Sequence, residues 1–402
     1  MIFGGVSAAQ HGALNTDRQA TSEAEPFPWM ARIADEAPVC LVHERFGDLA
    51  LCGAETGANL KSIEEDTLGS AVWQVDLDPS GDLVALLTED LQVWLWRWRS
   101  ESSPQPVAKL EAKGEVWHGW RFGAVVEFSP SGDRVLAALP RGEVLLLNRA
   151  GERVPLGVRA TSETSATGDG SDGHGTLRGA FALPHAWSSD GKRLALVRQS
   201  SACVFGALDG RVMTRFPDNP SAPMESVALD ADGSRLAIGR YGGVIQGYDV
   251  ESASEIWSYT FAETLMGGHD PQWNPIGFGD LEFSPNGALL AATSTTSIHG
   301  ILLDAASGEA LWSGAHQGGR MGEPAAIRWQ PGSTGFYFAF VSGVMPIVRV
   351  AIEEQEEGMI VKERTLERGT LPDIGCGGTG IYVTGTTARS IEAASHSALW
   401  RR

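Results

Sequence analysis

Short apolar runs joined by tight polar turns recur along the chain. Each copy has an alternating apolar run, a turn built from Pro, Ser, Asp or Asn that ends in Gly, and a second apolar run. Pro presets φ at the first turn position, the small polar side chains hydrogen-bond locally, and Gly adopts positive φ. Each copy therefore predicts a β-hairpin. The glycines of the five clear hairpins are Gly81, Gly132, Gly191, Gly233 and Gly287.

A second pair of strands is predicted after each hairpin. Residues 304–312 read DAASGEALW, and they place an acidic residue and a Ser/Gly turn between two apolar segments. Related segments occur at 247–257 and 390–400, with weaker forms at 205–213 and 49–60. Four strands per unit, repeated about every 40 to 60 residues, are typical of β-propeller blades. The predicted fold class is all-β, a single propeller of four-stranded antiparallel blades.

The repeat resembles the WD-repeat family. The segments FSPSGDRVLAA at 128–138 and LLDAASGEALW at 302–312 are similar to the two halves of its consensus. The resemblance covers residues 27–402 and implies a propeller that binds other proteins. The Trp-Asp dipeptide of the family is replaced, for example by Leu303 and Asp304, and Gly-His survives mainly at Gly268 and His269. The hydrogen-bonded tetrad of the family is therefore expected to be mostly absent, which leaves apolar packing to hold the blades.

The number of blades is predicted as eight, with seven as the alternative. Five clear units begin near residues 72, 122, 180, 225 and 279, and two more occupy 325–365 and 371–402. Residues 29–66 supply the eighth, unless they form only a covering strand and a loop. Residues 1–26 are predicted to be a flexible arm, 27–402 the propeller, and 159–178 a flexible loop, since the latter is rich in Ser, Thr, Gly and Asp.

Charge and composition narrow the function. The chain of 402 residues carries 31 basic and 50 acidic residues, a net charge of −19, which disfavours binding to nucleic acid. It has no apolar stretch long enough to span a membrane and no secretory signal pattern. The cysteines lie in apolar runs without metal-binding spacing, which predicts buried thiols in a reducing cytoplasm and no metal or cofactor. They are Cys40, Cys52, Cys203 and Cys376.

The candidate binding surface is one face of the ring. The connections from the outer strand of one blade to the inner strand of the next are the long ones, and insertions on one face of a repeat array usually mark its binding face. They are rich in the aromatic and Arg residues of interaction hot spots. As an alternative, their tryptophans seal the central channel, and His269 and His316 are remnants of Gly-His positions. The candidate partner-binding residues are Trp117, His118, Trp120, Arg121, Arg141, Arg240, Tyr241, His269, Trp273, His316 and Arg320.

A second candidate surface lies in residues 93–99. These residues alternate, so Trp94, Trp96 and Trp98 share one side of a strand. They are expected to be core or blade-edge packing. If their side is the outer edge of the blade, it is a second contact surface.

The sequence favours a non-catalytic scaffold or adaptor subunit that docks a protein partner. One alternative is a recognition or sensor module of a bacterial defence or signalling complex. Another is a propeller enzyme, because residues 304–312 also resemble the repeat of quinoprotein dehydrogenases, and a lactonase-like metal site would use inward carboxylates. Asp76, Glu127 and Glu282 recur on inner strands, but no nucleophile triad, phosphate loop or metal motif accompanies them. The chain is therefore not predicted to be an enzyme.

Overall fold

The computed structural model is built of β-strands, with two 3-10 turns at Glu65–Leu68 and Pro331–Ser333 among the residues it describes. The described residues are 28–33, 37–44, 49–53, 58–101, 103–112, 124–139, 142–157, 183–198, 201–216, 222–260, 278–294, 299–315, 325–340, 345–355, 358–369, 373–377, 380–384 and 389–393.

The strands form eight antiparallel sheets, each made of consecutive strands paired in chain order. The first sheet contains β1 (Pro28–Ile33), β2 (Val39–Glu44), β3 (Leu49–Gly53) and β4 (Asn59–Ile63), and the second β5 (Val72–Leu77), β6 (Val84–Thr88), β7 (Gln92–Trp96) and β8 (Gln105–Lys109). The third contains β9 (Val125–Phe128), β10 (Arg134–Ala138), β11 (Val144–Asn148) and β12 (Arg153–Val154), and the fourth β13 (His185–Trp187), β14 (Arg193–Arg198), β15 (Ser201–Gly206) and β16 (Val212–Phe216). The fifth contains β17 (Met224–Leu229), β18 (Arg235–Arg240), β19 (Val244–Asp249) and β20 (Glu255–Thr260), and the sixth β21 (Phe278–Phe283), β22 (Leu289–Ser294), β23 (His299–Asp304) and β24 (Ala310–Ala315). The seventh contains β25 (Ala325–Trp329), β26 (Gly335–Phe340), β27 (Met345–Gln355) and β28 (Gly358–Gly369), and the eighth β29 (Asp373–Gly377), β30 (Gly380–Thr384) and β31 (Arg389–Ala393).

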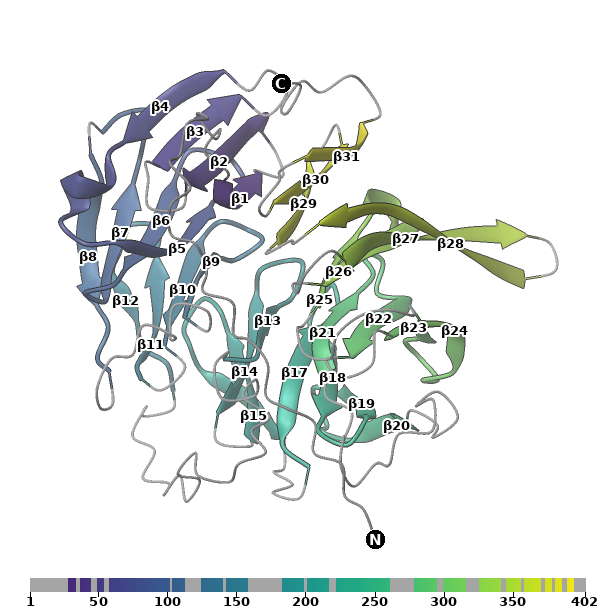
Figure 1. Cartoon of the computed structure of the whole chain (residues 1–402). Helices are drawn as coiled ribbons and strands as arrows, with labels where there is room; N and C mark the ends of the chain where they lie inside the picture. Colours follow the sequence, from purple (N-terminus) through teal and green to yellow (C-terminus); the bar gives the residue numbers. More distant parts are fainter. Residues whose placement is uncertain are drawn as a thin grey trace, which may run out of the picture.

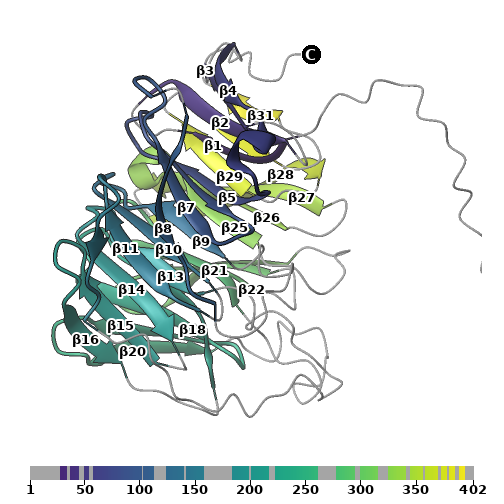
Figure 2. The ribbon, with the colours of Figure 1, turned by 90° about the vertical axis from the view of Figure 1, so that its left-hand side faces the viewer.

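The eight sheets are the blades of a ring, which Figure 1 shows along its axis and Figure 2 from the side. The first strand of each blade is its inner strand: β5 contacts β9, β17 contacts β21, and β25 contacts β29. The ring closes where β29 meets β1. The prediction of a propeller is confirmed, and residues 29–66 form a blade rather than a cover. The predicted arm 1–26 and loop 159–178 lie outside the described residues.

The hairpins between the first and second strands form because a polar side chain in each turn accepts hydrogen bonds from backbone amides of that turn. In the second blade, Asp78 Oδ1 accepts hydrogen bonds from the amides of Asp82 at 2.8 Å and Leu83 at 2.7 Å. Gly81 has φ of 71°, a value that costs little without a Cβ. Ser129, Ser188, Asp230 and Ser284 take the position of Asp78 in the next four blades, and each accepts from the amide five residues later.

The cores lie between blades rather than within them. Alternate residues of a strand point to opposite faces, so in β10 Val135 and Ala137 pack against the second blade, whereas Leu136 and Ala138 pack against the fourth. Each blade thus has two apolar faces, and its neighbours cover both.

The tryptophans of residues 93–99 do not form a blade edge. β7 is the third strand of its blade, and Trp96 and Trp98 are buried, with Trp94 packed beside them, in the core that the first and second blades share. Trp98 Nε1 also donates to Gly81 O at 2.7 Å. The hypothesis of a second contact surface here is therefore wrong, although the prediction that the three side chains share one side is confirmed.

Trp257 joins the fifth blade to the sixth. Its ring lies against Gly308, and Nε1 donates to Ala305 O at 3.0 Å, so the indole fills the space beside the turn between β23 and β24. A Cβ added at Gly308 would lie 2.6 Å from Trp257 ring atoms, and φ there is 72°. Gly332 has a similar φ of 80° but nothing within 4 Å of an added Cβ.

We expect Gly308→Ala to destabilise the protein more than Gly332→Ala does. Both changes place alanine at positive φ, which costs about 1 kcal/mol. Only the first also forces the alanine against a buried indole, which adds about 1–3 kcal/mol. The measurement is the midpoint of denaturant unfolding for both variants. Equal midpoints would show that Trp257 does not hold the two blades together.

Candidate functional site

The meander of each blade divides its connections between two faces of the ring. First-to-second and third-to-fourth strand connections open on one face, named here the turn face. Second-to-third strand connections and those between blades open on the other, the loop face. On the turn face the connections are short, as between β9 and β10 or β19 and β20. The longest connections, at 110–124, 155–184 and 261–277, all belong to the loop face.

Two of the predicted partner-binding residues are described, and both belong to the loop face of the fifth blade. Arg240, at the end of β18, is buried, and its guanidinium donates to Gln246 Oε1 and, at 3.1 Å, to Ala222 O. Tyr241 is partly exposed, and its amide donates to Pro223 O at 2.9 Å. Burial, together with the charge of Glu225, raises the pKa of the Tyr241 hydroxyl. Of these two residues, Tyr241 is therefore partly exposed to solvent, whereas Arg240 is buried.

The other nine predicted residues lie outside the described residues, so their role in docking stays a prediction. They are Trp117, His118, Trp120, Arg121, Arg141, His269, Trp273, His316 and Arg320.

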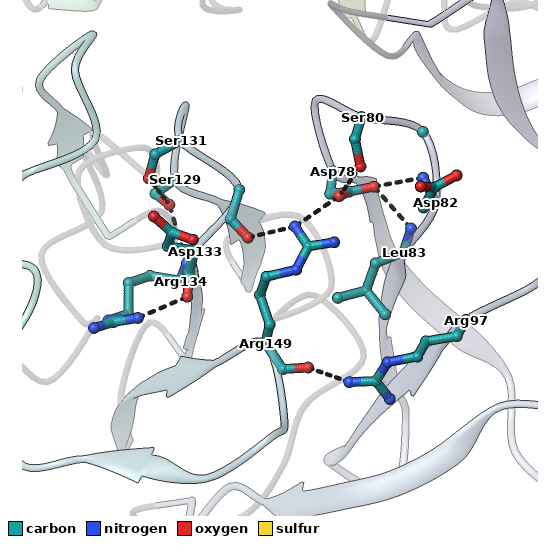
Figure 3. Close-up of polar contacts among 12 residues, drawn as sticks. Asp78, Ser80, Asp82, Leu83, Arg97, Ser129, Ser131, Asp133, Arg134 and Arg149 are labelled. Carbon is teal, nitrogen blue, oxygen red and sulfur yellow. Dashed lines mark hydrogen bonds and ion pairs between the residues drawn. The ribbon is translucent and has the colours of Figure 1, made fainter.

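Polar side chains on the turn face bind one blade to the next (Figure 3). Arg149 lies in the turn after β11 of the third blade, and its Nη1 donates to Asp78 Oδ2 in the second blade at 2.8 Å and to Gly132 O at 2.9 Å. The Asp78 side chain is fully buried, so this ion pair is shielded from solvent on one side. Arg97 of the second blade donates in return to Arg149 O at 2.5 Å.

In three successive blades, an arginine two residues after the turn glycine makes a different blade-to-blade hydrogen bond, to a carbonyl of the following blade. Arg134 donates to Ala207 O of the fourth blade at 2.8 Å, Arg193 to Gly233 O of the fifth at 2.8 Å, and Arg235 to Gly287 O of the sixth at 2.6 Å. The Gly-x-Arg spacing is visible in the sequence, and it is the signal from which these bonds could have been predicted. Four arginines of the turn face are thus occupied by contacts within the ring, namely Arg134, Arg149, Arg193 and Arg235.

The inner strands carry polar side chains that bridge neighbouring blades. Asp76 Oδ2 on β5 accepts the amide of Phe128 on β9 at 2.6 Å. Asp280 Oδ2 on β21 accepts the amide of Ile327 on β25 at 2.9 Å. The inner edge of each blade has no further strand to pair with, so these carboxylates provide partners for amides that would otherwise lack them.

Glu127, His185, Asp280, Glu282 and Arg328 form what we name the inner-strand cluster. His185 Nε2 lies 2.5 Å from Glu127 Oε2, and Nδ1 lies 2.9 Å from Leu183 O. Burial alone would lower the pKa of His185, but the charge and hydrogen bond of Glu127 outweigh it, and Asp280 adds to the effect. The pKa of His185 is therefore raised above its ordinary value, which favours the imidazolium paired with Glu127.

The two acids of β21 share one cation. Arg328 Nη1 lies 3.9 Å from Glu282 Oε2, an atom that is buried and has no hydrogen-bond partner. The Glu282 side chain is 33% exposed, so burial acts mainly on this one oxygen. Burial raises the pKa of Glu282 to about 8, with Arg328 opposing and the Asp280 charge adding to the rise. Burial also raises the pKa of Asp280, against the opposing effect of Arg328.

Glu282 can hold a proton near neutral pH, because its pKa is raised to about 8, and the raised pKa of His185 favours its protonated form. Both residues belong to inner strands. Within the described ranges, no group of three or more His, Cys, Asp or Glu side chains is placed to hold a metal ion. The predicted recurrence of carboxylates on inner strands is confirmed, but the role of each is a contact between blades. The sequence did not reveal His185 or Arg328 as their partners, because those pairings depend on which blades are adjacent.

Comparisons with solved structures support the fold. Kluyveromyces lactis Hsv2 superimposes with a TM-score of 0.56 at 10% identity, covering 86% of this chain and 100% of that chain. Hsv2 from Kluyvelomyces marxianus gives a TM-score of 0.55 at 11% identity, covering 86% and 99%. At this identity the likeness concerns the fold alone.

In sequence, 166 residues are 29% identical to a protein named eukaryotic translation initiation factor 3 subunit I, from Eremothecium gossypii. The match covers 40% of this chain and 40% of the curated relative's length. No family model matches the chain. The fold and the repeat together define a WD-repeat-like β-propeller. In the part of the chain that the structure describes, no helix is long and apolar enough to cross a membrane.

We expect Glu282→Gln to stabilise the protein at alkaline pH but not at acidic pH. The pKa of this carboxyl is about 8 in the folded state, against a reference value of 4.5. Between those values the unfolded chain loses a proton that the folded chain keeps, so the free energy of unfolding falls as pH rises and levels off above the folded pKa. The glutamine carries no charge and avoids this loss. At alkaline pH its free energy of unfolding should exceed that of the wild type by ~1 kcal/mol, after allowing for the solvent exposure of the side chain.

The melting temperatures of wild type and Glu282→Gln, recorded from about pH 5 to pH 9, test this prediction. The two curves should converge at the acidic end and separate toward the alkaline end. Parallel curves would show that Glu282 is ionised across the whole range and that its burial has little effect.

Proposed function

We propose that this protein is a non-catalytic interaction scaffold whose loop face docks a protein partner. The observation that carries the proposal is the uneven distribution of its connections. Among the described strands, those that flank the three longest connections end and begin on the loop face, whereas the longest connection of the turn face is 97–104. Insertions confined to one face of a repeat array usually form its binding surface.

The arginines of the turn face support this assignment, because their side chains bind groups of the ring itself. The guanidinium groups of Arg134, Arg149 and Arg235 donate to carbonyls or carboxylates of the neighbouring blade. Arginine is a frequent anchor of protein interfaces when its donors are free to meet a partner. Because these donors are already used in blade-to-blade bonds, the turn face is suited to stabilising the ring.

The composition of the loop-face connections supports a protein as the partner. Residues 113–122 and 262–277 include Trp117, Trp120 and Trp273, and tryptophan is enriched at the centres of protein interfaces. The net charge of −19 disfavours a nucleic acid on the same surface. The matched curated protein is named as a subunit of a factor, which agrees with a role inside a complex.

Affinity purification from the native host, followed by mass spectrometry, tests the proposal. We expect a stoichiometric protein partner that is retained by wild type and lost from the triple variant Trp117→Ala, Trp120→Ala, Trp273→Ala, because truncating interface tryptophans removes ~2 kcal/mol or more each. The matched control is Leu208→Ser, which changes a side chain that is 80% exposed on the turn face. The control should retain the partner.

Two outcomes would overturn the docking face. One is a partner that survives the triple variant and is lost from Leu208→Ser. The other is a small molecule or metal that co-purifies with turnover of a substrate and without a protein partner, which would favour the alternative of a propeller enzyme. Circular dichroism melting of the triple variant shows whether its ring is intact.

A further inference from the structure

Two cysteines of the first blade face each other across adjacent strands. Cys40 on β2 is the direct partner of Cys52 on β3 in an antiparallel register that runs without a shift from Val39 to His43. Neither cysteine is part of a disulfide. Directly opposite residues of an antiparallel pair have Cα atoms about 4.5 or 5.5 Å apart, depending on their hydrogen bonding. Both separations lie within the span of a disulfide, about 4.4–6.8 Å, so a bond requires no movement of the strands.

The two thiols differ in their exposure. Cys40 is 1% exposed, whereas Cys52 is partly exposed. The hydrogen bond with the Cys52 thiol and burial both raise the pKa of the Cys40 thiol. The outer thiol is therefore the one that a reagent in solution reaches first, and the inner thiol is in contact with it.

The cysteine pair lies on the face of its blade that points away from the second blade. Val39, Leu41 and Leu51, the neighbours of the cysteines in β2 and β3, pack into the core shared with the second blade. Because successive side chains of a strand point to opposite faces, Cys40 and Cys52 point toward the eighth blade. That is where β29 meets β1 and the ring closes (Figure 1).

We propose that Cys40 and Cys52 are a reversible redox modification site, which a low-molecular-weight disulfide such as oxidised glutathione converts to a cross-strand disulfide. The Cys52 thiolate attacks one sulfur of glutathione disulfide and releases one glutathione thiolate. Cys40 then loses its proton to that thiolate or to solvent and attacks Cys52 Sγ, and the second glutathione leaves. Two protein thiols are oxidised, and one glutathione disulfide is reduced to two thiols. An excess of glutathione reverses both steps.

The disulfide would act on the blade at which the ring closes. It links β2 to β3 across their connecting loop and limits the freedom of that segment when the blade unfolds. Oxidation therefore stabilises the first blade, and reduction returns it to the thiol form seen here.

The experiment incubates the purified full chain in glutathione buffers of increasing oxidised fraction. Free thiols are then alkylated, and disulfide-linked peptides are identified by mass spectrometry. We expect the loss of two thiols and one linked peptide pair that contains Cys40 and Cys52, reversed by reduced glutathione. The melting temperature should rise by several degrees on oxidation.

Cys52→Ser should abolish both the linked peptide and the rise in melting temperature. The matched control is Cys203→Ser, which removes a buried thiol in the fourth blade and should leave both unchanged.

Three results would overturn the proposal. They are four free thiols under every glutathione buffer, a linked peptide that contains Cys203 or Cys376 in place of this pair, and a glutathione adduct that stays on Cys52 without the release of a second glutathione. A linked pair without a change in melting temperature would refute its effect on the blade.

Discussion

Apolar packing between neighbouring blades is the interaction on which this ring depends. In the third blade, Val135 faces the second blade and Leu136 faces the fourth, and both are fully buried. A single blade would expose both faces to water, at about 25 cal/mol for each Å² of apolar surface. No blade is therefore covered until its neighbours are in place, and closing the ring covers the last two faces. Polar side chains therefore lie on the inner strands, on the outer strands and in the connections.

The polar bonds determine how the packed blades are aligned. Apolar contacts have little directionality. The bond of Arg149 to buried Asp78 fixes one blade relative to the next at the turn face, and the bond of Asp280 to the Ile327 amide does the same near the axis. These bonds cross between blades. They differ from a tetrad that ties the strands of one blade together, which explains how repeats without the Trp-Asp dipeptide form a regular ring.

The sequence was sufficient for the fold because both of its signals are local. The turn glycines and the alternating apolar residues act within one hairpin, so Gly81 and Gly287 predict the same structure independently. Residues that act between blades were harder to predict. The tryptophans at 94, 96 and 98 were correctly expected to share one side, but β7 ends at Trp96, Trp98 lies in the turn that follows, and the shared side is covered by the first blade. The Glu127–His185 contact joins residues of different blades and has no signal in either segment alone.

The seam between the first and eighth blades follows from the same constraint. The described strands of each sheet are contiguous in sequence, and β1 contacts β29 and β30 where the first and eighth blades meet. Elsewhere in the ring, the chain itself runs from one blade into the next and keeps them close when a contact opens. At the seam, the described strands of the two blades are joined by noncovalent contacts. A disulfide between Cys40 and Cys52 would therefore stabilise one of the two blades that meet there.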